Sequence, residues 1–74
     1  MAAEVDRDRI DTLPEQVAER LGYAVDRMAR GARLDPAELA TAFGVSRRTV
    51  SRALTILQRA GKVTIMASRG AYVA

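Results

Sequence analysis

Apolar residues recur along the N-terminal part of the chain with the spacing of an α-helix. Five of them fall on one helical face: Val17, Leu21, Ala24, Val25 and Met28. The pattern predicts a helix from Leu13 to Arg30, in which Thr12 is the N-cap and Glu15 returns the capping-box hydrogen bond. Gly31 stands where the residue after a helix belongs. Met28 is expected in the core with the rest of this face.

A second, shorter helix is predicted after Asp35, which is typical of an N-cap and is followed by a proline. Its apolar face consists of Leu39, Ala40 and Phe43, and Gly44 ends it. Ser46 is a further N-cap, so a connection of only about three residues joins this helix to the next one.

The third predicted helix runs from Arg47 to about Ala60, with Gly61 closing it. At 100° per residue its side chains separate into two sets. The apolar set is Val50, Ala53, Leu54 and Leu57, and the polar set on the opposite arc is Arg48, Ser51, Arg52, Thr55 and Arg59. The helix can therefore bury one side while it presents arginines on the other.

The C-terminal stretch alternates in the manner of β-strands and is rich in β-branched residues. A strand is predicted to begin near Lys62, ASRG supplies a turn with Arg69 and Gly70 at or near its tip, and AYVA forms a second strand. Leu34 could add a brief edge strand to this sheet. Met66 is expected in the core, and two side chains are expected to be partly buried packing residues: Tyr23 and Tyr72.

The predicted order of elements is helix, short strand, helix, helix and hairpin, which is a mainly α fold with a small β-hairpin. Two helices joined by a glycine-containing turn, the second opening with Ser-Arg-Arg-Thr, are typical of a helix-turn-helix. The prediction is therefore a winged helix-turn-helix, with three helices and a C-terminal wing, over residues 12–74. Residues 1–11 alternate charge with little apolar content and are expected to form a flexible arm.

Charge is divided unevenly along the chain. All nine acidic residues lie at or before Glu38, together with six basic ones, whereas residues 39–74 hold six basic residues and no acidic one. GC-rich coding, suggested by fourteen alanines and by eleven arginines against one lysine, would add arginine everywhere. Such coding does not explain the missing acids, so we expect the second half to face a polyanion.

The composition excludes most catalytic and metal chemistry. The chain has no cysteine and no histidine, which removes disulfides, thiol nucleophiles, imidazole bases and the usual zinc ligands. Two carboxylate pairs occur, Glu15 with Glu19 and Asp35 with Glu38. Capping and solvated faces explain both pairs better than acid–base catalysis does. We therefore expect no enzyme, no cofactor and, in a chain of 74 residues, no small-molecule site.

No apolar run is long enough to span a bilayer, and the N-terminus is too charged for a signal peptide. A cytoplasmic protein is the default.

The start of the third helix carries the candidate site, because a recognition helix enters the DNA major groove by its N-terminal end. The side chains that can reach base edges or flanking phosphates there are Arg47, Arg48, Thr49, Ser51 and, one turn on, Arg52. Arginine gives bidentate contacts to guanine, and Ser46 as N-cap leaves backbone N–H groups beside the phosphates. Thr49 could instead pack at the boundary with the second helix, and Ser46 could be only a cap.

The hairpin supplies the second part of the site. Arg69 beside the flexible Gly70 suits insertion into a narrow minor groove, where the negative potential attracts guanidinium groups. The alternative for Arg69 is a turn residue that points at water. Lys62 would touch phosphate, if it touches DNA at all. Arg59 lies about 16 Å along the helix from Arg48, which is too far to share its groove contact.

At these motifs the sequence resembles a known family. LATAFGVSRRTVSRALTILQRAGKV resembles the winged helix-turn-helix of bacterial GntR-type transcription regulators, and the match extends over about residues 35–74. The positions that fall in place are Leu39, Ala40, Phe43, Gly44, Val45, Ser46, Arg47, Thr49, Val50, Ala53, Leu54, Gly61, Gly70, Tyr72 and Val73.

Three departures from the family pattern accompany this resemblance. Ser51 stands where the family usually has arginine, Ala71 replaces the wing threonine, and the PG-then-LPS signature between the first two helices is missing. Closely related winged-helix groups share the pattern of the second and third helices and stay open as alternatives.

The resemblance implies sequence-specific binding of double-stranded DNA by a transcription regulator, in its simplest form a repressor that occupies its operator near the nucleoid. One winged helix buries too little surface for tight selective binding, so a homodimer on an inverted repeat is expected. The alternative is a protein-interaction module of a plasmid, phage or replication complex, against which the acid-free second half argues. A chain that stops just after the wing suits either a complete protein or one domain of a longer regulator.

Overall fold

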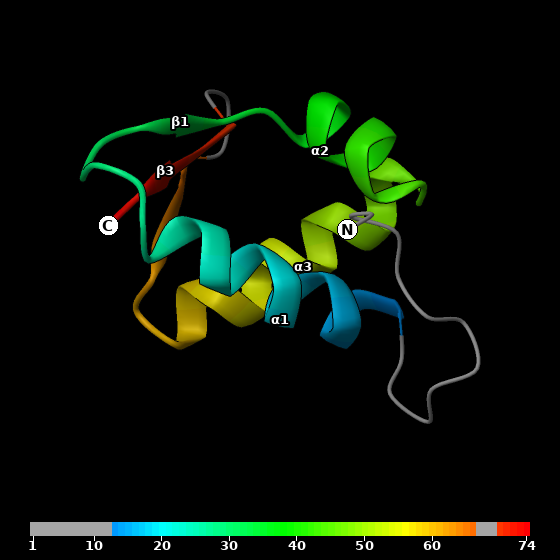
Figure 1. Cartoon of the computed structure of the whole chain (residues 1–74), viewed down its shortest axis with the longest axis horizontal. Coiled ribbons are helices and arrows are strands. Elements are labelled where there is room, and N and C mark those ends of the chain that lie inside the picture. The colour runs from blue at the N-terminus through cyan, green and yellow to red at the C-terminus, as the bar shows by residue number, and fades with distance from the viewer. Residues whose placement is uncertain (1–12, 67–69) are drawn as a thin grey trace.

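A computed structural model describes residues 13–66 and 70–74, which form three helices and three strands (Figure 1). In chain order they are α1 (Leu13–Val25), β1 (Arg33–Leu34), α2 (Pro36–Phe43), α3 (Arg47–Arg59), β2 (Val63–Met66) and β3 (Gly70–Val73). This is the predicted winged helix-turn-helix. The expected arm at residues 1–11, the Thr12 cap and Arg69 at the wing tip lie outside the described residues.

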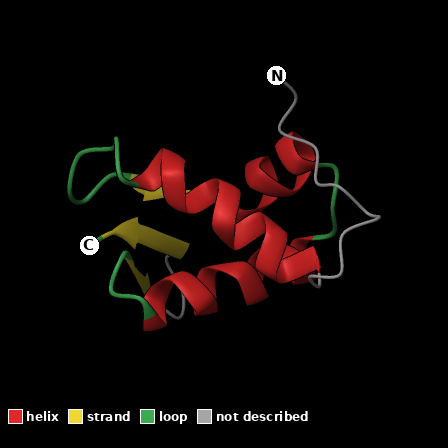
Figure 2. Cartoon of the chain, turned by 60° about the horizontal axis from the view of Figure 1, so that its bottom comes forward, coloured by secondary structure: helices red, strands yellow, loops and turns green. Residues whose placement is uncertain are grey.

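The three strands form one antiparallel sheet in the order β1-β3-β2. In the hairpin, Val63 pairs with Val73 and Met66 pairs with Gly70. On the other edge Leu34 pairs with Ala71, which confirms the brief edge strand predicted at that residue. The sheet lies at one end of the three helices (Figure 2), so the fold brings the segment between α1 and α2 next to the wing.

One apolar core joins the helices to the sheet. α1 packs along α3, and the sheet closes one end of this pair (Figures 1 and 2). Every element contributes, through Val17, Ala18, Leu21, Val25, Leu34, Ala40, Phe43, Val50, Ala53, Leu54, Leu57, Val63, Ala71 and Val73. Because short helices gain most of their stability from such packing, none of these elements is expected to persist alone.

Local chemistry sets the ends of α2 and α3 close to where the sequence predicts them. The Asp35 carboxylate accepts a hydrogen bond from the Ala37 amide at 2.9 Å, which caps the start of α2. Gly44 ends α2 with φ +69°, a left-handed conformation that glycine adopts without strain. α3 ends at Arg59, one residue before the predicted end, and Gly61 follows with φ +80°.

The first helix is shorter than predicted, because it ends at Val25 instead of Arg30. Beyond this point the amides of Arg27 and Met28 donate to carbonyls three residues back, at 3.1 and 3.0 Å, so the last turn tightens and stops. The chain then turns, and the Gly31 amide donates to the Val73 carbonyl at 2.8 Å. Pairing with β3 thus overrides the helical pattern, and Gly31 belongs to a turn instead of a helix cap.

Three side chains are more exposed than predicted: Tyr23, expected to be partly buried, and Met28 and Met66, expected in the core. Tyr23 is 68% exposed on the outer side of α1, Met28 is 37% exposed beyond the end of that helix, and Met66 is 42% exposed. Met66 lies opposite Gly70, which has no side chain to cover it. Ala24, which the helical pattern assigned to the apolar face, is also exposed. Tyr72 is half-buried, as predicted.

Two glycines give a matched test of this fold. A Cβ at Gly22 would lie 3.4 Å from Leu57 Cδ2, an ordinary contact, inside a helix where alanine is favoured by about 1 kcal/mol. The turn at Gly44 requires a left-handed backbone, and alanine adopts that conformation only at a cost of about 1–2 kcal/mol. We expect Gly22→Ala to raise the free energy of unfolding and Gly44→Ala to lower it, measured by urea denaturation. Changes of the same sign would contradict these backbone assignments.

Candidate nucleic-acid interface

The link between α2 and α3 is short and is fixed by Ser46. The Ser46 backbone is extended, with φ −76° and ψ 159°, and its Oγ accepts a hydrogen bond from the Thr49 amide at 3.1 Å. The hydroxyl oxygens of Ser46 and Thr49 lie 3.0 Å apart. This arrangement holds the first turn of α3 in place. The positive end of the helix and its remaining first-turn amides can therefore meet an anion.

The two arcs predicted for α3 are confirmed. Val50, Ala53, Leu54 and Leu57 are buried. We call the exposed residues of the polar arc, together with the exposed Arg47 in the first turn, the basic face; its members are Arg47, Arg48, Ser51, Arg52, Thr55 and Arg59. None of its four arginines forms an ion pair with another described residue. The guanidinium groups are therefore not neutralised by the acidic residues of α1 and α2 that the structure describes.

Thr49 lies between the two arcs of α3. Its side chain is half-buried, and its hydroxyl oxygen is within hydrogen-bond distance of Ser46. This placement gives Thr49 a part in the cap, whether or not it also contacts a ligand.

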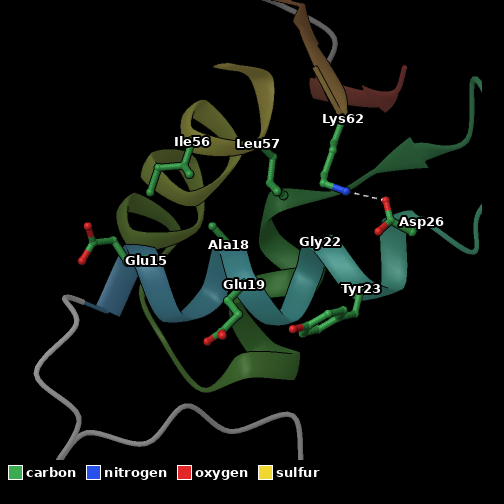
Figure 3. A pocket seen from close by; sticks show the side chains of 9 residues that line it. All are labelled: Glu15, Ala18, Glu19, Gly22, Tyr23, Asp26, Ile56, Leu57 and Lys62. Carbon is green, nitrogen blue, oxygen red and sulfur yellow. Dashed lines mark hydrogen bonds and ion pairs between the residues drawn. The ribbon is translucent and has the colours of Figure 1, made fainter. Parts of the chain in front are cut away.

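Lys62 lies away from the basic face. It follows the C-terminal end of α3, and its Nζ is 2.6 Å from Asp26 Oδ1 just beyond α1 (Figure 3). Ion pairs as exposed as this one contribute little to stability. To reach a phosphate, the ammonium group would have to share its hydrogens with this carboxylate or leave it, so the phosphate contact stays a prediction.

At the wing the structure adds a residue that the sequence reasoning missed. Gly70 opens β3 with φ +87°, and a Cβ there would lie 3.5 Å from the Leu34 carbonyl oxygen and 3.7 Å from Arg33 Nη2. The Arg33 guanidinium therefore lies against the start of β3, at the turn end of the hairpin, where Gly70 pairs with Met66. A signal was present in the sequence, since Arg33 precedes the leucine from which the edge strand was predicted.

An open groove of about 400 Å³ runs between α1 and α3, and it is lined by Glu15, Ala18, Glu19, Gly22, Tyr23, Asp26, Ile56, Leu57 and Lys62 (Figure 3). Within residues 13–66 and 70–74, no three acidic side chains gather closely enough to hold a metal ion. No helix in the same ranges is long and apolar enough to cross a membrane.

A capped turn, a helix with an exposed basic face and a hairpin packed beside it define a winged helix-turn-helix protein. Residues 13–73 match the family model of the bacterial regulatory proteins of the gntR family, and the chain belongs to this family. Comparison with curated proteins found no match.

Solved structures share the fold. The DNA-binding domain of AraR, in complex with operator ORX1, is 22% identical with a TM-score of 0.82, and the alignment covers 96% of this chain and 94% of that one. YtrA from Sulfolobus acidocaldarius, a GntR-family transcription factor, is 24% identical with a TM-score of 0.78, over 99% of this chain and 80% of that one. The possible transcriptional regulator YydK from Bacillus subtilis is 21% identical with a TM-score of 0.75, over 85% of this chain but only 29% of its own.

The cap at Ser46 can be tested separately from any ligand. We expect Ser46→Ala to lower the free energy of unfolding by about 1 kcal/mol, because the Thr49 amide loses its acceptor. Ser46→Asp should keep nearly all of the stability, since aspartate caps as well as serine and its charge favours the helix N-terminus. Urea denaturation of both variants checks this. Equal loss in both would show that capping is not what Ser46 contributes.

Proposed function

We propose that this chain binds double-stranded DNA sequence-specifically and regulates transcription. The observation that carries the proposal is the basic face of α3. Its guanidinium groups are exposed and form no ion pair with another described residue, and three of the four lie in the N-terminal half of this capped helix. Membership of the gntR family supports it. So does the operator DNA bound to AraR, a protein of the same fold.

In the proposed complex α3 enters the major groove by its N-terminal half. Arg47, Arg48 and Arg52 are the side chains for guanine edges or flanking phosphates, and Ser51 is short enough to let the helix approach the bases closely. Thr49 remains a candidate contact beside the cap. The Ser46 cap directs the first-turn amides toward a phosphate. Arg59, about 16 Å further along the helix than Arg48, reaches backbone at most.

The wing provides the second contact. We propose that Arg69 and Gly70 enter or approach the adjacent minor groove, and that Arg33 adds a cation beside Gly70 at the same end of the hairpin. Arg33 is placed there by the pairing of β1 with β3, so it belongs to the wing although it precedes the helix-turn-helix in the chain.

We further propose that two copies bind an inverted repeat. One such domain contacts only a half-site, and selective binding among many competing sites requires a second one. Occupying an operator in this way blocks transcription, so a repressor is the simplest form of the regulator. Such a protein acts in the cytoplasm, where the nucleoid is.

The decisive variant combines Arg48→Ala with Arg52→Ala. Each bidentate arginine–guanine contact is worth about 1–3 kcal/mol, so the double variant should lose roughly 30-fold or more in affinity. The assay is a gel shift on genomic fragments, including the region upstream of this gene, at two salt concentrations. Arg30→Ala, an exposed arginine away from the basic face, is the matched control and should change binding by no more than about threefold.

A steep fall in affinity with salt is also expected, because each neutralised phosphate releases counterions. A shallow salt dependence, or unchanged binding by the double variant, would overturn the proposal in favour of a protein-interaction module.

Arg33 makes a distinct prediction. If its guanidinium contacts phosphate from the wing, Arg33→Ala should weaken binding to operator and unrelated DNA alike, and should reduce the slope of log affinity against log salt by about 1. Arg33→Lys should retain most of the affinity, because a phosphate contact requires charge more than a planar fork. Loss confined to one DNA sequence would instead assign Arg33 to base recognition.

A further inference from the structure

A pocket of about 250 Å³ lies between α3 and the hairpin. From α3 it is lined by Ser51, Leu54 and Thr55, and from the hairpin by Ile65, Met66 and Ala71. We call it the wing pocket. It is separate from the groove between α1 and α3, and it opens beside the basic face, to which Ser51 and Thr55 also belong.

The wing pocket is apolar on its inner and hairpin sides. Leu54 and Ala71 are nearly inaccessible, so they form its floor. Ile65 and Met66 are 36% and 42% exposed. Two of the four exposed large apolar side chains in the described part of the chain therefore lie at this one place. Exposed apolar surface that gathers in this way is typical of a binding site.

The α3 side of the wing pocket carries two hydroxyl groups. Thr55 Oγ1 donates a hydrogen bond to the Ser51 carbonyl at 3.1 Å, which occupies its hydrogen. The Ser51 hydroxyl has no hydrogen-bond partner among the described residues. Arg47 and Arg48 lie one helical turn before Ser51 and add positive charge on the same side. This side of the pocket is therefore suited to an anionic group.

The geometry of a duplex indicates what the wing pocket meets. One sugar–phosphate backbone separates a major groove from the minor groove beside it. In the complex proposed above, α3 lies in the major groove and the wing at the adjacent minor groove, so this backbone passes between them. A phosphate against Ile65 and Met66 would lose its hydration without a partner. Deoxyribose instead offers carbon–hydrogen surface, which matches these apolar side chains.

We propose that the wing pocket takes one deoxyribose of each half-site and selects against ribose. The proposal rests on the DNA-binding function proposed above and adds discrimination by sugar. The C2′ methylene group packs against Ile65 and Met66, and the Ser51 hydroxyl donates to a phosphate next to that sugar. The 2′-hydroxyl of a ribose would be buried on the hairpin side without a hydrogen-bond partner.

The test replaces single nucleotides of the most tightly bound fragment by ribonucleotides, one position at a time. At one position of each half-site, ribose should weaken binding by wild type about tenfold, because a buried hydroxyl without a partner is costly. A 2′-fluoro sugar at that position is the matched DNA control. It favours the ring pucker of ribose but cannot donate a hydrogen bond, so it should weaken binding by no more than about threefold. Gel shifts measure both affinities.

Met66→Gln tests whether the wall of the wing pocket causes this effect. The glutamine amide can hydrogen-bond the 2′-hydroxyl, so the loss caused by ribose should shrink to about twofold or less. Met28→Gln is the matched control, since it makes the same change at a side chain of similar exposure beyond the end of α1. It should retain the full tenfold loss. Both positions are exposed, so both variants should fold, which urea denaturation checks.

The two proposals fail in different ways. If wild type binds no duplex at all, the DNA-binding function is wrong and the sugar site with it. Tight binding to DNA with no position sensitive to ribose would refute the sugar site alone. So would a loss that the 2′-fluoro sugar reproduces in full, or an equal ribose effect in Met66→Gln and Met28→Gln.

Discussion

Burial of one side of α3 determines what the whole domain can present to a partner. Val50, Leu54 and Leu57 contact the core, and each contributes about 1.5–3 kcal/mol by leaving water. Turning Arg48 or Arg52 into that space would add the larger penalty of an unpaired buried charge. Both effects select the same rotation of the helix about its axis. The arginines are therefore exposed as a consequence of the packing, without partners among the described residues to hold them there.

The surrounding elements fix that helix relative to the rest of the domain. Gly44 and Ser46 set the turn from α2 at one end of α3, and the hairpin follows at its other end. The β1–β3 pairing ties the hairpin to the segment before α2, and this places Arg33 beside Gly70. Two separate stretches of sequence thus form one wing, next to a helix whose polar arc is already determined.

Local rules predict α3, its cap and the hairpin, because each depends on residues that are near one another in the chain. Ser46 caps an amide three residues on, and the two arcs of α3 follow from its period. The failures involve distant partners. α1 stops early because Gly31 bonds to Val73, and Lys62 meets Asp26, 36 residues away. Arg33 was missed for the same reason, since only the register of β1 against β3 brings it to the wing. Helical periodicity carries no information about such competing pairings.

The claim that α3 lies with its basic face along a duplex is tested most directly by following the backbone amide signals of the labelled chain as operator DNA is added. The account predicts that the largest shifts cluster at residues 46–55, with smaller ones at the wing, and that amides on the buried side of α1 barely move. Shifts concentrated in the groove between α1 and α3, with residues 46–55 unchanged, would contradict it.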